Sequence, residues 1–539
     1  MKHFLIVATS LLLLSVSASD SRLTDRQRAL HALNRLGFGA RPGDVDRVLK
    51  TGVDTWIDQQ LHPEVIPDRE LDARLQTLPT LKMSDAEMML KYYRPIVEAR
   101  RDRKNAKNDG QPDIKDKEAM QMLRKNAQQV TADLVSQRII RAAESDRQLN
   151  EVMVDFWFNH FNVFVGKGID RFLLTSYERD VIRPHIWGRF EDLLLATAKS
   201  PAMLFYLDNA RSVAEPANRP KMTQRPAGGF RGGMFGRRMP VDEDQMMRRR
   251  AQQQNANKNK GGLNENYARE IMELHSLGVD GGYTQKDVTE LARVLTGWTI
   301  DPRTGAFLFR PQLHDAGSKT VLGVRFASGG GMEEGERMIH ILAHHPATAH
   351  RIASKLCQRL VSDDPPPALV DRVAKKFLDT DGDLRQTVKA VIDSPEFWDP
   401  KFYRAKVKSP FEYVISAVRA VNGTIDNPMP IARALQQIGE PLYGAQPPTG
   451  YSDKADAWVN TGALLNRLNF ALALAANKLP GLHSDVVSLV PSGSVDALAV
   501  ALTGGNLTDE TRNTIKDRDN TQMPMIAGLI LGSPEFQRQ

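Results

Sequence analysis

The chain has 539 residues, one cysteine and a formal net charge of +7. A single cysteine excludes an internal disulfide framework, a zinc site built from cysteines and an iron–sulfur cluster. Charged residues make up 25% of the chain and hydrophobic residues 41%, which excludes both wholesale disorder and a membrane protein with many spans. The length corresponds to about three domain-sized units.

The first 18 residues have the form of a secretory signal peptide. A basic start, Met1-Lys2-His3, precedes an apolar run from Phe4 to Leu14, and small residues follow at Val16-Ser17-Ala18. The apolar run is shorter than the about 20 residues that a membrane-spanning helix needs. We therefore expect residues 1–18 to be removed on export. The mature protein is expected to be periplasmic or secreted, without a transmembrane anchor.

Nearly every periodic stretch after the signal peptide predicts a helix. Capping boxes at Thr24–Gln27 and Thr284–Asp287 each open an amphipathic segment. The mixed charges of Glu98–Lys125 predict an exposed helical hairpin or a loose excursion. Only Phe307 to Phe326 resembles strands, and it predicts one small β-hairpin with its turn at Asp315–Ser318. The expected fold is all-α, a single multi-helical body of several lobes.

Residues 211–262 interrupt the helical pattern. They include the Gly- and Arg-rich run Gly228–Gly233, and they are too polar to offset the entropy of ordering. We expect a disordered basic insertion between an N-terminal helical part, 19–210, and a C-terminal helical part, 263–539. The insertion holds 12 Lys and Arg against 4 Asp and Glu, so the rest of the chain sums to −1.

This distribution of charge bears on the partners. A nucleic-acid-binding fold carries its basic excess on the folded surface, so no nucleic-acid partner is expected. An acidic glycan is the candidate partner for the basic insertion.

The densest polar cluster is Asn264–His275. On a helix, Asn266, Glu270 and Glu273 share one face, and Arg269 lies four residues before Glu273, where the two are expected to pair. Carboxylates one turn apart have Cβ atoms about 5–6 Å apart, which suits acid–base catalysis or a hard cation. The alternative is a buried polar network that locks two helices together.

A second cluster, Asp155–Asn162, surrounds a histidine with aromatic residues. It suits a grip on a sugar or an aromatic substrate, with Trp157 as a stacking platform and Asn159 as a binding residue. His160 or His275 would then assist the carboxylates in catalysis. The alternative is an aromatic core helix whose polar groups bond to the backbone or to each other.

Other histidines carry weaker signals. His314 and Asp315 could form an acid–base pair, although a turn in which the aspartate caps its own backbone also explains them. His340 and His344 have the spacing of metal ligands but lack the glutamate of the HExxH motif. The sequence therefore predicts no metal site, and it names no cofactor.

Several segments resemble the bacterial "domain of unknown function 1800" family. They are His31–Gly43, Trp157–Phe161, Ala202–Asn209 and Ser533–Phe536, with the strongest match in Asn264–His275 and its continuation to Trp298. The resemblance implies an exported, largely helical protein. Genes of this family often lie beside genes for proteins that resemble alkaline phosphatases and sulfatases. The resemblance implies no established reaction and no catalytic residue.

Two classes of function remain open. The first is an exported binding or assembly factor that acts with a partner enzyme, such as the phosphatase- or sulfatase-like protein, on a cell-surface or extracellular polymer. The second is a hydrolase or lyase of a polysaccharide or sulfated polymer that uses the carboxylates of Glu270 and Glu273.

Overall fold

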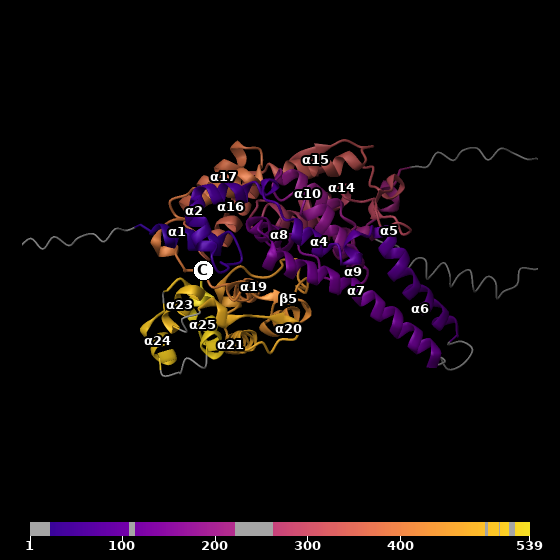
Figure 1. Ribbon diagram of the computed structural model, residues 1–539. Helices are drawn as coiled ribbons and strands as arrows, with labels where there is room; N and C mark the ends of the chain where they lie inside the picture. Colours follow the sequence, from indigo (N-terminus) through magenta and orange to yellow (C-terminus); the bar gives the residue numbers. More distant parts are fainter. Residues whose placement is uncertain (1–21, 107–113, 221–261, 491–493, 506, 517–522) are drawn as a thin grey trace, which may run out of the picture.

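The computed structural model describes residues 22–106, 114–220, 262–490, 494–505, 507–516 and 523–539 (Figure 1). These residues form mainly helices, with three short two-stranded pairs, which confirms the all-α, multi-helical fold. The predicted signal peptide, residues 1–18, lies outside the described residues. So does most of the predicted insertion, residues 221–261.

The described chain begins with five short helices, of which the first three pack on one another. Thr24 and Gln27 form the predicted capping box at the start of the first helix. The guanidinium of Arg35 at its end is buried and donates to the Phe402 carbonyl at 2.8 Å, which ties the N-terminus to a distant segment. The helices are α1 (Asp25–Arg35), α2 (Asp44–Thr51), α3 (Val53–Leu61), α4 (Arg69–Leu75) and α5 (Asp85–Met88).

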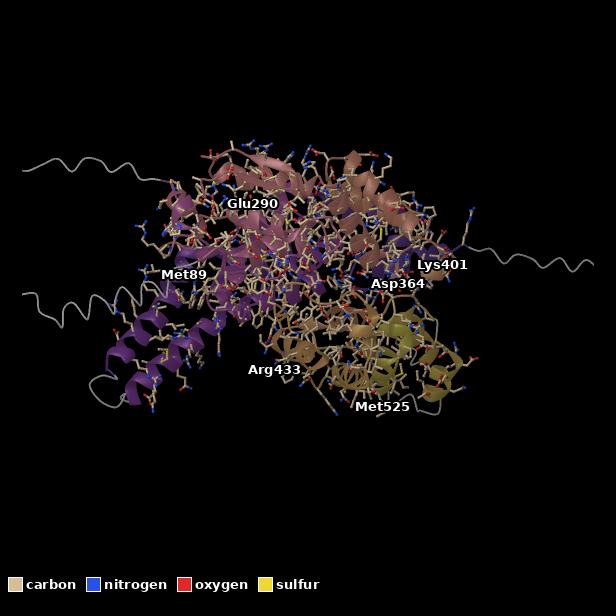
Figure 2. All side chains as sticks on the ribbon, turned by 180° about the vertical axis from the view of Figure 1, so that it is seen from behind. Met89, Glu290, Asp364, Lys401, Arg433 and Met525 are labelled. Atoms are coloured by element: carbon tan, nitrogen blue, oxygen red, sulfur yellow. The ribbon has the colours of Figure 1, made fainter. Side chains whose placement is uncertain are left out.

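A helical hairpin projects from the body. Helix α6 (Arg94–Ala106) and the first half of α7 (Ile114–Glu144) lie side by side, and both views show them extending away from the other helices (Figures 1 and 2). Met89 lies at the base of the hairpin and belongs to a small core of its own with Ile96 and Met120. The structure thus confirms the helical hairpin of the two predicted alternatives.

The centre of the body is built on α8 (Gln148–His160), most of whose residues are buried. Helices α3 and α7 pack on it, and the Phe190 ring contacts Trp157. The next helices along the chain are α9 (Asp170–Ser176), α10 (Phe190–Lys199) and α11 (Pro201–Tyr206). One hydrophobic core runs from Ala29 to Phe536, so the N-terminal and C-terminal parts share it.

The predicted first residue of the insertion, 211, lies too early in the sequence, because the structure describes the chain up to residue 220. The Val213 N–H donates to the Gly262 carbonyl at 3.3 Å, and the Ala214 N–H donates to the Leu313 carbonyl at 2.9 Å. Ala214 is buried as well. The Ala316 N–H also donates to the Asn218 carbonyl at 2.9 Å, so the first part of the predicted insertion contacts the body, although several of its residues are exposed. Composition alone could not reveal these main-chain contacts, because their partners are far along the chain.

The predicted pairing of strands between Phe307 and Phe326 is wrong. Strand β2 (Phe307–Phe309) pairs with the upstream β1 (Trp298–Ile300), and β3 (Lys319–Val321) pairs with β4 (Val324–Phe326), both antiparallel. The β3–β4 turn is Leu322-Gly323, where both residues have positive φ, as two-residue hairpin turns require. A third pair joins β5 (Thr424–Ile425) to β6 (Leu482–His483).

The middle of the chain is again helical, and α16 packs closely on α17. The single cysteine, Cys357, is fully buried in α16. The helices of this part are α13 (Glu265–Glu270), α14 (Gln285–Val294), α15 (Met332–Ala343), α16 (Pro346–Leu360), α17 (Pro367–Asp379) and α18 (Leu384–Ile392). Thr284 forms the second predicted capping box, at the start of α14.

The C-terminal helices form a layer on one side of the body (Figure 1). Helices α21 and α25 approach closely at Gly528, where a Cβ would lie 2.9 Å from the Cα of Leu472. The helices are α19 (Pro410–Ala420), α20 (Met429–Ile438), α21 (Thr461–Ala475), α22 (Val486–Leu489), α23 (Val495–Thr503), α24 (Asp509–Lys516), α25 (Met523–Gly532) and α26 (Pro534–Gln537). None of the helices in the described ranges is long and apolar enough to cross a membrane.

Candidate functional site

The polar cluster 264–275 forms a helix whose second half is widened. Asn264 caps α13, and its side-chain oxygen accepts from the N–H groups of Asn266 and Tyr267. After Glu270 the helix continues as a π-helical turn, Ile271–Ser276. This turn shifts the side chains that follow it, so that His275 is buried. A regular helical pattern could not predict the shift.

Glu270 and Glu273 are both half-buried, and Asn266 is exposed. Burial raises the pKa of Glu270 above its usual range, and the charge of Glu273 adds to this effect. The predicted pair between Arg269 and Glu273 is not among the ion pairs of the described residues. Arg269 instead donates to Gln285 at 2.6 Å, while Glu273 accepts from the Tyr283 hydroxyl at 3.3 Å.

The structure brings His160 and His275 together in the core. Nε2 of His160 lies 3.2 Å from the carbonyl oxygen of His275, and both rings are buried. Burial lowers the pKa of His275 to about 3 and that of His160 well below its usual value. Both rings are therefore neutral and weakly basic near neutral pH, which does not suit a general base.

Trp157 is also part of the core. Its side chain is 0% exposed and packs edge-on against Phe156 and His160. A ring enclosed in this way offers no face to a ligand, so this placement does not fit the stacking platform that the sequence suggested. It fits the alternative, an aromatic core helix.

His314 and Asp315 lie in a separate buried network. Nε2 of His314 lies 3.1 Å from Glu334, and Nδ1 lies 2.8 Å from the Thr296 carbonyl. Asp315 accepts two hydrogen bonds from Arg293, at 2.9 and 3.0 Å, and a third from the Gly317 N–H. The aspartate therefore caps its own turn, as the alternative predicted. His314 and Asp315 do not join Glu270 and Glu273.

A different set of polar residues converges on a cavity between α8 and the segment 440–458, here called the polar cavity. Its volume, about 50 Å³, has room for a few water molecules or one small polar group, but not for a whole small molecule. The charged side chains that line it come from α7, α8, α16, α19 and the flanking segments, and they include Arg138, Asp155, Arg359, Lys406, Glu412 and Glu440.

Two asparagines after the aromatic run hold the wall of the polar cavity. The Asn159 side chain makes two hydrogen bonds to the backbone of Tyr451: it donates to the carbonyl at 2.8 Å and accepts from the N–H at 2.7 Å. Asn162 donates to the carbonyls of Ala445 and Pro447. Gly450 has φ +70°, and a Cβ on it would lie 2.4 Å from the Asn159 carbonyl oxygen, so the close approach requires glycine. The predicted binding residue Asn159 therefore positions the wall.

Asp155 lies between two guanidinium groups. Arg138 donates to its Oδ1 at 2.8 Å, and Arg359 lies 3.8 Å from its Oδ2. Arg359 also pairs with Glu412, which is buried and accepts from the Ser409 N–H at 2.8 Å. The two guanidinium groups hold the side chain of Asp155 in one orientation.

Glu440 has a different environment in the same cavity. Burial raises the pKa of Glu440 to about 7, and the negative charge of Asp155 adds to this; the Phe411 N–H, which donates to Glu440 at 2.8 Å, opposes it. The cavity thus holds a carboxyl group that keeps its proton up to near-neutral pH beside a carboxylate fixed by arginines. Paired carboxyl groups in unequal environments are typical of functional sites.

Sequence reasoning found only Asn159 among the residues of this cavity that matter chemically. Arg359 and Glu440 lie more than 190 residues beyond α8 in the sequence, and no local spacing links them to it. Asp155 belonged to the aromatic cluster, where its place four residues before Asn159 was the one signal that could have drawn attention to it.

The comparison with protein families agrees with the resemblance. The model of the family described as "Protein of unknown function (DUF1800)" matches residues 31–538. The chain therefore belongs to this family, and the whole polar cavity lies inside the matched range. No curated protein and no solved structure matches the chain.

Proposed function

We propose that this member of the DUF1800 family is an exported binding or assembly factor, which holds a hydroxyl-bearing group of a cell-surface or extracellular polymer in the polar cavity. The form of residues 1–18 supports export. The factor acts with a partner enzyme, for which the phosphatase- or sulfatase-like proteins encoded beside members of this family are candidates. The basic segment 221–261 provides a second contact, with an acidic glycan.

The observation that carries this proposal is the side-by-side arrangement of fixed donors and acceptors in the cavity. A hydroxyl group is both a donor and an acceptor, so it pairs well with a carboxylate next to a guanidinium, such as Asp155 next to Arg359. The rings of Tyr451 and Trp458, whose centres lie 6.0 Å apart, belong to the apolar part of the wall, and they bound the side of the cavity where such a hydroxyl group would sit. The small volume admits one such group of a larger ligand.

Binding of neutral and sulfated oligosaccharides to the mature protein, measured by calorimetry, tests the proposal. We expect Asp155→Asn to weaken binding about tenfold or more, since the charge-assisted hydrogen bond to the ligand is lost. Glu273→Gln, which changes a half-buried carboxylate outside the lining of the polar cavity, is the matched control and should bind like the wild type. Equal binding by wild type and Asp155→Asn, with both folded, would contradict the proposal.

The raised pKa of Glu440 supports a second candidate, a hydrolase or lyase of such a polymer. Glu440 would donate a proton to the leaving group, and Asp155 would supply the carboxylate, in place of the pair Glu270 and Glu273. This candidate predicts release of new chain ends by the purified protein and its loss in Glu440→Gln. If the protein is a binding factor, neither the wild type nor Glu440→Gln should release chain ends from a polymer that it binds.

A further inference from the structure

We infer that Glu191, His340 and His344 form a binding site for a divalent transition-metal ion, with Zn²⁺ as the best-matched ion. Glu191 lies in the first turn of α10, His340 in the last turn of α15, and His344 caps α15. The two histidines alone did not predict a site, because the glutamate of the HExxH motif is missing between them. The fold supplies it from 149 residues away.

The ligand atoms have the separation that a small ion requires. Nδ1 of His340 lies 3.0 Å from Oε2 of Glu191, and Nδ1 of His344 lies 3.9 Å from the same oxygen. Metal–ligand bonds of about 2.0–2.1 Å in a tetrahedral site place neighbouring ligands about 3.3 Å apart, between these two distances. One ligand atom from each residue lies within 4.8 Å of the others.

Two imidazoles and one carboxylate are a typical protein ligand set for Zn²⁺, with the fourth position left to water. His340 is exposed, with 57% of its side chain accessible, so solvent can take that fourth position. The site therefore has the open form in which a bound ion can still accept another ligand.

A second carboxylate orients one of the histidines. Oδ1 of Asp381 lies 2.5 Å from Nε2 of His344, and Nδ1 on the other side of the ring lies 3.9 Å from Oε2 of Glu191. Carboxylate–histidine pairs of this kind are common behind metal ligands. Asp381 also pairs with Arg189, so it is held from both sides.

Backbone hydrogen bonds fix the position of Asp381 relative to Glu191. The Phe190 N–H donates to the Gly382 carbonyl at 2.8 Å, and the Leu384 N–H donates to the Gly188 carbonyl at 2.9 Å. The turn that carries Asp381 is thus tied to the start of α10, which carries Glu191. Rigid support of this kind holds a metal ligand and its partner in a fixed geometry.

The backbone also places one acceptor beside His344. Nδ1 of His344 lies 2.8 Å from the carbonyl oxygen of His340. When the ring proton is on Nε2, Nδ1 of His344 and the carbonyl oxygen of His340 both present lone pairs to each other. A cation next to Nδ1 offsets the repulsion between these two atoms. A second proton on the ring would do the same, so the experiment must separate zinc binding from protonation.

Calorimetry with Zn²⁺ alone, near neutral pH, tests the site on the mature chain after removal of any tag and dialysis against a chelator. We expect one Zn²⁺ per chain, a loss of affinity of about tenfold or more in His340→Gln and in Glu191→Gln, and a loss of about tenfold in Asp381→Asn. His350→Gln is the matched control, because His350 is exposed, lies 3.7 Å from Asp371 and has no third ligand beside it among the described residues. It should bind zinc like the wild type.

Melting temperatures measured in the presence of a chelator distinguish a variant that no longer binds zinc from one that no longer folds. Without metal, all four variants should melt at the same temperature as the wild type. Zinc should raise the melting temperature of the wild type and of His350→Gln but not of His340→Gln. The inference is overturned if the wild type binds no Zn²⁺ at micromolar concentrations, or if His340→Gln and Glu191→Gln bind it as tightly as the wild type does.

Discussion

Replacing Glu440 by Gln should flatten the dependence of stability on pH. Burial raises the pKa of Glu440 from 4.5 to about 7, so the folded protein keeps a proton that the unfolded chain releases. The stability that this proton provides is fully present below about pH 4.5, declines as the pH rises, and is lost above about pH 7. A shift of about 2.5 pH units at 1.36 kcal/mol per unit corresponds to about 3 kcal/mol.

Urea titrations of wild type and Glu440→Gln at several pH values between about 4 and 8 give the measurement. All other carboxyl groups titrate in both proteins, so the difference between the two free energies of unfolding isolates Glu440. We expect this difference to change by about 3 kcal/mol across the range, in favour of the variant at high pH. Glu118→Gln, at an exposed position on α7, is the control and should show a constant difference. Parallel curves for wild type and Glu440→Gln would refute the reasoning.

Three further predictions concern single side chains. Burial raises the pKa of Asp170 to about 9, and neither of its carboxyl oxygens has a hydrogen-bond partner among the described residues. In urea titrations, the stabilising effect of Asp170→Asn should therefore grow from pH 4 to pH 9. A difference in the free energy of unfolding that stays constant over this range would contradict the prediction. Gly450→Ala should destabilise by about 1–3 kcal/mol, because of its positive φ and its contact with Asn159; an unchanged melting temperature would argue against this. Trp157→Ala should cost about 3–5 kcal/mol as a core cavity; a loss below 1 kcal/mol would show that the ring is not packed as described.

Elements with local signals could be predicted from the sequence. The capping boxes at Thr24 and Thr284 lie within four residues of the helices that they open, and both helices are present. The hairpin of α6 and α7 was one of the two structures that a local pattern of charge indicated. Hydrogen bonds between near neighbours decide such elements, and these neighbours are visible in the sequence.

Features that depend on distant partners could not be predicted. Strand β1 pairs with β2 through main-chain hydrogen bonds that no side-chain pattern specifies. The π-helical turn after Glu270 moves His275 into the core, although a regular helix would place it elsewhere.

The candidate sites follow the same division. Asn159 could be selected from its neighbours in the sequence, but Glu440 and Glu191 acquire their partners only through the fold. The polar cavity and the proposed metal site therefore required the structure.

Fluorine NMR of protein labelled with 5-fluorotryptophan tests the central claim, ligand binding in the polar cavity, most directly. The chain has six tryptophans, and Trp458 lines the cavity while Trp157 is buried in the core. The resonance that disappears in Trp458→Phe is assigned to Trp458. Titration with an oligosaccharide that binds should shift this resonance and leave that of Trp157 unchanged. Saturating ligand that shifts another tryptophan and leaves Trp458 unmoved would contradict the account.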